Sequence, residues 1–238
     1  MSPKSLGRWL DGGSILRRNA YAVAKVLDIE PWAIWPDFAP TGAALPQLTD
    51  DETEPVLSVS DHGITDVFLS RAELIGSYPP AEILAEATRL RVMGLSLNQV
   101  VQSVSDRQLR AAVGRGTELQ CLFLEPYSRY TSDREAEEGH AAGILSQLTV
   151  TNIDTLKRAR RHLPADAAPR LVVRTYDAPV RFNIMIIDDS VAIVQFYLPA
   201  ARGTESPALV LRPTATPPDL FSEFTTVFDD AWATAKEV

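Results

Sequence analysis

Short apolar runs alternate with longer amphipathic stretches through most of this sequence, and this rhythm limits the possible folds more than any other feature. The apolar runs lie at residues 66–70, 90–96, 117–125, 170–177, 181–187, 191–198 and 208–213. Residues 79–89 begin with two prolines, and residues 105–116 have a serine cap and a glycine stop, as helices do. Strands joined by helices fold onto one sheet, so we expect an α/β domain whose mixed sheet is flanked by helices.

Three local patterns refine this expectation. Residues 132–163 have helical spacing interrupted by Gly139 and Gly143, which predicts two helices. Asp188 and Asp189 separate two apolar runs and predict a tight hairpin turn. The final segment predicts an amphipathic helix, whose buried stripe comprises Leu220, Phe224, Val227, Phe228, Ala231 and Trp232.

Residues 37–60 divide the chain. They contain three prolines and a run of four acidic residues and one threonine, with no lysine or arginine, which is the composition of a linker. Residues 1–36 precede this linker and carry a local surplus of basic residues, although the whole chain has a net charge of -8. We therefore predict a small helical segment at 1–36, a linker at 37–60 and the α/β domain at 61–238.

Composition excludes several classes of protein and site. The net charge of -8 argues against a protein that coats nucleic acid over its whole surface. Three histidines lie far apart, and the single cysteine, Cys121, lies in an apolar run, so we expect neither a metal site nor a disulfide, and no cofactor. The sequence has neither an eighteen-residue apolar run nor a signal peptide, so we expect a soluble, cytoplasmic protein without membrane contact.

The N-terminal segment has two short helical patterns, at residues 2–13 and 17–30, and these resemble the recognition helix and the following helix of the Cro/repressor-like (XRE) helix-turn-helix family. The resemblance implies that Lys4, Ser5 and Arg8 face DNA and that Arg17 and Arg18 hold phosphates. Two further helices precede the recognition helix in that family. The helix-turn-helix segment is thus either truncated ahead of Met1 or no longer binds DNA. The alternative interpretation of residues 1–36 is a small helical cap with a solvated basic face.

Residues 181–195 resemble the strand and hairpin that carry the H-x-K-x-x-x-x-D motif of the phospholipase D superfamily. Asp188 matches the motif, whereas Arg181 and Asn183 stand in place of the histidine and lysine, and Gln195 and Phe196 in place of the usual Gly-Ser. A guanidinium offers no lone pair for nucleophilic attack, and an asparagine carries no charge. The resemblance implies a phospholipase D-like domain in which Arg181, Asn183 and Asp188 bind a ligand without turnover. Asp188 has an ordinary alternative role as a turn residue, and Arg181 and Asn183 could simply point outward from an edge strand.

Glu125 and Tyr127 follow the apolar run at 117–125. Ligands in open α/β sheets bind at the carboxyl ends of strands, so we add both residues to the predicted ligand site, with a solvated loop as the alternative.

The order of parts leads to the principal hypothesis, a transcription regulator. Its C-terminal domain would bind a small anionic ligand or dimerise, and the homodimer would read a palindrome in DNA. The rival hypothesis is a divergent phosphodiesterase or nuclease that uses His140 or His162. A third is a module that only dimerises.

Overall fold

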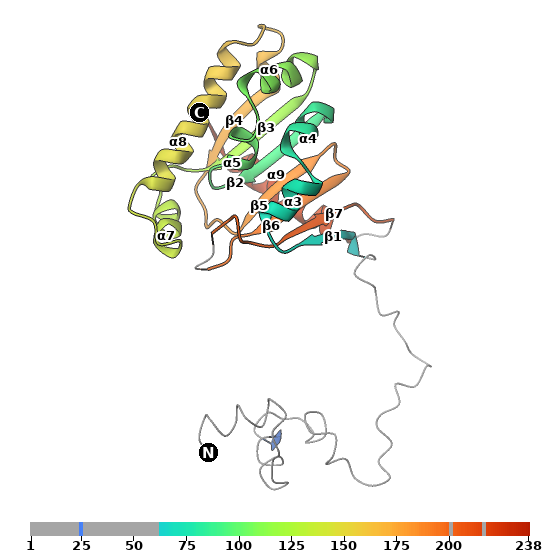
Figure 1. The fold of residues 1–238 in the computed structure, drawn as a ribbon, viewed down its shortest axis with the longest axis vertical. Helices are drawn as coiled ribbons and strands as arrows, with labels where there is room; N and C mark the ends of the chain where they lie inside the picture. The colour runs from blue at the N-terminus through green and yellow to red at the C-terminus, as the bar shows by residue number, and fades with distance from the viewer. Residues whose placement is uncertain (1–23, 26–61, 200–201, 216–217) are drawn as a thin grey trace. The chain divides into compact units, whose positions relative to one another are not determined.

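The computed structural model describes residues 24–25, 62–199, 202–215 and 218–238 (Figure 1). Contacts separate the chain into two units, Met1–Val56 and Leu57–Val238. Except for Ala24 and Lys25, the predicted helix-turn-helix segment and linker lie outside the described residues. The domain division at 36/37 and 60/61 stays a prediction.

The described part of the second unit contains one eight-stranded sheet in the order β1-β7-β6-β5-β2-β3-β4-β8. Its strands are β1 (Ile64–Phe68), β2 (Arg89–Gly94), β3 (Glu118–Leu124), β4 (Leu171–Tyr176), β5 (Phe182–Ile187), β6 (Val191–Phe196), β7 (Ala208–Leu211) and β8 (Lys236–Glu237). Strands β2, β3 and β4 run parallel, and every other neighbouring pair is antiparallel. The predicted α/β class with a mixed sheet is confirmed.

Helices cover both faces of the sheet. The described helices are α3 (Arg71–Ser77), α4 (Pro80–Glu86), α5 (Asn98–Val101), α6 (Asp106–Arg115), α7 (Arg129–Glu137), α8 (Ile144–Arg161), the 3-10 turn η4 (Ala168–Arg170) and α9 (Leu220–Thr234). Figure 1 shows α3, α4, α5 and α6 in front of the sheet and α9 behind it. Because strand side chains alternate between faces, two apolar clusters form, one under α3 to α6 with α8, and one under α9.

Local signals account for most helix boundaries. Ser105 and Gln108 form a reciprocal capping box at the start of α6, and Gly116 ends this helix with a φ of 120°. Gly139 and Gly143 have φ angles of 69° and 87°, so the chain leaves the helical conformation between α7 and α8. The predicted split of 132–163 into two helices is therefore confirmed.

The predicted stripe on the last helix is wrong at two positions. Phe221 and Phe228 are the buried residues of α9, whereas Val227 is 37% exposed. Two arginines on the sheet face beneath α9 account for its placement. Arg91 of β2 donates to Asp229 of α9 at 2.8 Å, and its guanidinium lies 5.4 Å from the centre of the Phe228 ring.

Arg174 of β4 holds the other end of α9. Its Nη1 donates to the carbonyl of Trp232 at 3.0 Å, and its guanidinium lies 4.6 Å from the centre of the Trp232 ring. The helix therefore lies where a buried cation, Arg91, and a half-buried one, Arg174, reach its side chains and its last carbonyls, which apolar spacing alone does not reveal.

Replacement of Arg91 distinguishes the contribution of its packing to the free energy of unfolding from the contribution of its charge. The Arg91 side chain is 5% exposed, but its partners Asp189 and Asp229 are about half exposed and stay hydrated when the arginine is removed. We expect Arg91→Ala to lower the free energy of unfolding by about 2–4 kcal/mol through lost packing, and Arg91→Met to lower it by less than about 1.5 kcal/mol. Urea denaturation measures both, and an equal loss in the two variants would contradict this account.

Candidate ligand site at the carboxyl edge of the sheet

The sheet topology brings most of the predicted ligand residues to one edge. Parallel strands β2, β3 and β4 end at this edge, the antiparallel strand β5 begins there, and β6 ends there. Glu125 and Tyr127 follow β3, while Arg181 and Asn183 lie at the start of β5. The carboxyl edge thus holds four of the five predicted residues, as open α/β sheets commonly arrange their ligand contacts.

Asp188 lies at the opposite edge, about 17 Å from Asn183 along β5. Its Oδ1 accepts hydrogen bonds from the backbone N–H and hydroxyl of Thr88 and from the backbone N–H of Arg89, each at 2.8 Å. Burial raises the pKa of this carboxyl, but the hydrogen bonds from Arg89 and Thr88 outweigh it and lower the pKa. Asp188 joins the hairpin to the start of β2 and does not share a site with Asn183.

Asn183 is 8% exposed and faces its register partner Gln195 on β6. Within the described part of the chain, its side-chain amide forms no hydrogen bond. A Cβ atom on Gly94 would lie 2.8 Å from the Nδ2 atom of Asn183, so the glycine at the end of β2 leaves the room that this amide occupies. The amide donors of Asn183 are therefore available to a ligand at this edge.

Gln195 fills the position where the phospholipase D motif has glycine. Its side chain is 2% exposed, and its Nε2 donates to the carbonyls of Gly203 and Ser206 at 2.7 and 3.0 Å. Its Oε1 accepts from the Nε and Nη2 atoms of Arg71 at 3.2 and 2.9 Å. This amide thus holds a guanidinium from α3 beside Asn183.

Arg71 is a site residue that the sequence analysis missed. It lies 124 residues from Gln195 in sequence, so no local pattern links the two. Burial lowers the pKa of Arg71, while Tyr197 and Glu138 partly offset this by raising it, and the group stays protonated. Among the described residues, no carboxylate lies within salt-bridge distance of it.

Arg134 of α7 forms a wall of the same region. It is 2% exposed, lies 5.1 Å from the centre of the Tyr197 ring, and forms ion pairs with Glu137 at 2.9 Å and Glu138 at 2.7 Å. The Tyr197 hydroxyl accepts from the backbone N–H of Leu95 at 3.2 Å. Arg134 is therefore occupied by carboxylates, unlike Arg71.

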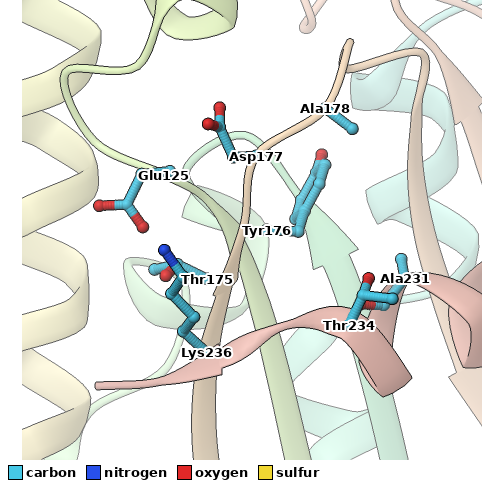
Figure 2. Close-up of a pocket in the computed structure, with 8 residues that line it drawn as sticks. All are labelled: Glu125, Thr175, Tyr176, Asp177, Ala178, Ala231, Thr234 and Lys236. Atoms are coloured by element: carbon cyan, nitrogen blue, oxygen red, sulfur yellow. The ribbon is translucent and has the colours of Figure 1, made fainter.

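Glu125 lines a separate pocket at the ends of β3 and β4, drawn in Figure 2. The pocket has a volume of about 280 Å³. Its lining residues are Glu125, Thr175, Tyr176, Asp177, Ala178, Ala231, Thr234 and Lys236. Tyr127 is absent from this lining, is 64% exposed, and donates its hydroxyl to Gln147 at 3.3 Å, so the structure separates it from Glu125.

The predicted DNA-binding residues and the histidines proposed for catalysis lie outside the candidate ligand site or outside the described residues. Lys4, Ser5, Arg8, Arg17 and Arg18 lie outside the described residues. Of the histidines proposed for catalysis, His140 lies between α7 and α8 and contacts Glu138 at 3.3 Å, whereas His162 follows α8 and is exposed. The described residues contain no group of three His, Cys, Asp or Glu that could hold a metal ion.

A family model described as a domain of unknown function, DUF5919, matches residues 62–238. The chain belongs to this family. No curated protein matches the chain. Within the described part of the chain, no helix has the length and apolar character needed to cross a membrane.

Several solved structures resemble the chain, and two of them are a phospholipase D family member and an archaeal chromatin protein. Nuc from Salmonella typhimurium, a phospholipase D family member, has a TM-score of 0.43 and 15% identity, over 73% of this chain and 97% of its own. TrmBL2, an archaeal chromatin protein described with a novel mode of DNA binding, has a TM-score of 0.40 and 17% identity, over 73% of this chain and 54% of its own. Neither likeness bears on the activity of the DUF5919 domain.

A buried carboxylate fixes the helices that frame this edge. Glu135 of α7 is 3% exposed and accepts from the backbone N–H groups of Gly143 and Ser146, at 2.8 and 3.0 Å, at the start of α8. Burial raises the pKa of Glu135, but the hydrogen bonds from Gly143, Ser146 and Leu145 outweigh it and lower the pKa. The ionised form of Glu135 thus caps α8 from a neighbouring helix.

We expect Glu135→Gln to lower the free energy of unfolding by about 1–3 kcal/mol at pH 7. Because the pKa of Glu135 is lower in the folded state, its stabilisation is complete above the unfolded value of about 4.3 and is lost as pH falls through the folded value. The difference between wild type and variant should therefore shrink below about pH 4. Chemical denaturation from pH 3 to 8 measures it, with the exposed Glu86→Gln as control, and a pH-independent difference would contradict the charged cap.

Proposed function

We propose that this chain is a transcription regulator whose DUF5919 domain binds a small anion without turning it over. The observation that carries the proposal is the group of Arg71, Gln195 and Asn183, in which Asn183 occupies the position where the resemblance to phospholipase D implies a catalytic lysine. Arg71 brings a cation from α3, and Arg181 stands in place of the nucleophilic histidine. Binding without turnover is the chemistry that these side chains support.

Arg71 would supply the positive charge that the motif places on the strand. Its Nε and Nη2 atoms are directed to Gln195, a neutral acceptor, and no carboxylate among the described residues forms an ion pair with the guanidinium. An anion beside it would gain charge-assisted hydrogen bonds from Arg71 and further donors from the Asn183 amide. Arg181 is exposed at the same edge of the sheet, and its charge would attract an anion over a longer range.

The regulatory role rests on the order of parts in the sequence. A segment that resembles a helix-turn-helix precedes a linker, and the proposed ligand-binding domain follows the linker. Ligand binding would therefore change how the two helix-turn-helix segments of a homodimer are placed against DNA. Lys4, Ser5 and Arg8 would contact bases or phosphates, and Arg17 and Arg18 would contact phosphates.

Bis(4-nitrophenyl) phosphate tests the anion site, because binding and hydrolysis of this probe are measured separately. We expect the full chain to bind it in a calorimetric titration and to release no nitrophenol. Arg71→Met and Asn183→Ala should each weaken binding at least tenfold, since each removes a donor, whereas Arg107→Met on the exposed face of α6 should not. Thermal melting confirms that each variant is folded.

Hydrolysis of this phosphodiester, abolished by His140→Ala, would overturn the proposal in favour of a divergent phosphodiesterase. Absence of binding in the folded protein would equally overturn the anion site.

The DNA-reading role is tested by selection of genomic fragments with the full protein, including any residues encoded ahead of Met1. We expect enrichment of a palindromic sequence, as a dimeric reader requires, and loss of this enrichment in a Lys4→Ala, Arg8→Ala double variant. Replacement of Lys157 and Arg161 on α8 is the matched control, because it removes the same charge from another part of the chain. Failure to enrich any sequence would refute the regulator.

A further inference from the structure

The pocket of Figure 2 supports an inference that goes beyond the proposed anion site. It lies between the ends of β3 and β4, the last turn of α9 and the strand β8. Its volume of about 280 Å³ is just below the usual range of about 300–1,000 Å³ for pockets of drug-sized ligands. A ligand of this pocket would therefore be a small metabolite.

Charges of both signs line the pocket without pairing. Glu125 and Asp177 carry carboxylates and Lys236 carries an ammonium, and none of the three forms an ion pair with another described residue. Figure 2 shows the Lys236 ammonium extending toward the side of the pocket where Glu125 lies. The pocket thus presents positive and negative groups that form no ion pair with one another.

The backbone around these charges is fixed. The backbone N–H of Glu125 donates to the carbonyl of Tyr176 at 2.8 Å, which ties the end of β3 to that of β4. Lys236 is the register partner of Thr175, so pairing of β8 with β4 sets the position of the ammonium. The Arg160–Glu237 ion pair at 3.3 Å also holds β8.

A buried hydroxyl provides a second observation. Thr175 lines the pocket and is 3% exposed, and its Oγ1 atom has no hydrogen-bond partner among the described residues. A buried hydroxyl without a partner lowers the stability of the folded state, so a ligand group that bonded to it would recover that free energy. The register partner of Thr175 is the residue that carries the ammonium, so both groups would meet the same end of a ligand.

We infer that this pocket binds a small zwitterion of the amino-acid class. The ligand's ammonium would lie by Glu125 and Asp177, and its carboxylate would lie by Lys236 and the Thr175 hydroxyl. A simple anion would meet two carboxylates, and a simple cation would meet Lys236, so a ligand with both charges fits best. Ala178 and Ala231 also line the pocket, so part of its lining is small and apolar.

The experiment measures the melting temperature and calorimetric affinity of the full chain with the twenty proteinogenic amino acids. For each amino acid that binds, its N-acetyl derivative lacks the ammonium and its amide lacks the carboxylate. We expect at least one short amino acid to raise the melting temperature, and both derivatives to bind at least tenfold more weakly.

Variants assign each charge to its partner. In Glu125→Gln the N-acetyl derivative should bind as tightly as the free amino acid, because the partner of the ammonium is gone. In Lys236→Met the amide should bind as tightly as the free amino acid, because the partner of the carboxylate is gone. Glu86→Gln and Lys157→Met remove the same charges elsewhere and should leave affinity unchanged. Thr175→Val should weaken binding of the free amino acid but keep the order of the three compounds.

Three outcomes would overturn the inference: no amino acid shifts the melting temperature of the folded protein, the derivatives bind as well as the free compounds, or the Glu125 and Lys236 variants behave as their controls do. Arg71→Met should still bind the amino acid. Failure of the anion site and failure of this pocket are therefore distinguishable.

Discussion

The pairing of β2 with both β3 and β5 is the constraint that brings the two candidate sites to one edge of the sheet. Strand β2 pairs in parallel with β3 and antiparallel with β5, so one edge gathers the ends of three parallel strands and the start of β5. Asp188 accepts three hydrogen bonds from Thr88 and Arg89 where β2 begins, and this fixes the hairpin against the strand. A one-residue shift of β5 against β6 would turn Asn183 to the opposite face of the sheet and separate it from Gln195 and Arg71.

Features encoded by neighbouring residues were predictable from the sequence. The β5–β6 hairpin, the serine cap and glycine stop of α6 and the glycine break between α7 and α8 depend on residues a few positions apart, and the structure confirms them. The stripe of α9 was predicted less well, because Arg91 and Arg174 reach this helix from distant strands. Helix α3 and strand β8 were missed, since each is short and is held by partners far away in the chain.

The candidate site shows the same limit. Sequence reasoning found Asn183 and Glu125 from a motif position and a strand end. It also grouped them with Asp188, which lies at the opposite edge, and with Tyr127, which lies outside the pocket that Glu125 lines. Arg71 became visible only through its contact with Gln195. A contact between a charged side chain on one element and an amide on a distant element produces no local sequence pattern. Strands and turns do produce such patterns.

The shortness of β8 has a consequence for the dynamics of the domain. Two residues pair with β4 at this edge of the sheet, so the strand can detach in a local opening that leaves the central strands intact. Detachment would carry Lys236 away from Thr175 and dismantle one wall of the pocket. Any compound that contacts this lysine would therefore shift the docking equilibrium of the strand, and the slowing of amide hydrogen exchange along the outer side of β4 would report occupancy of the pocket.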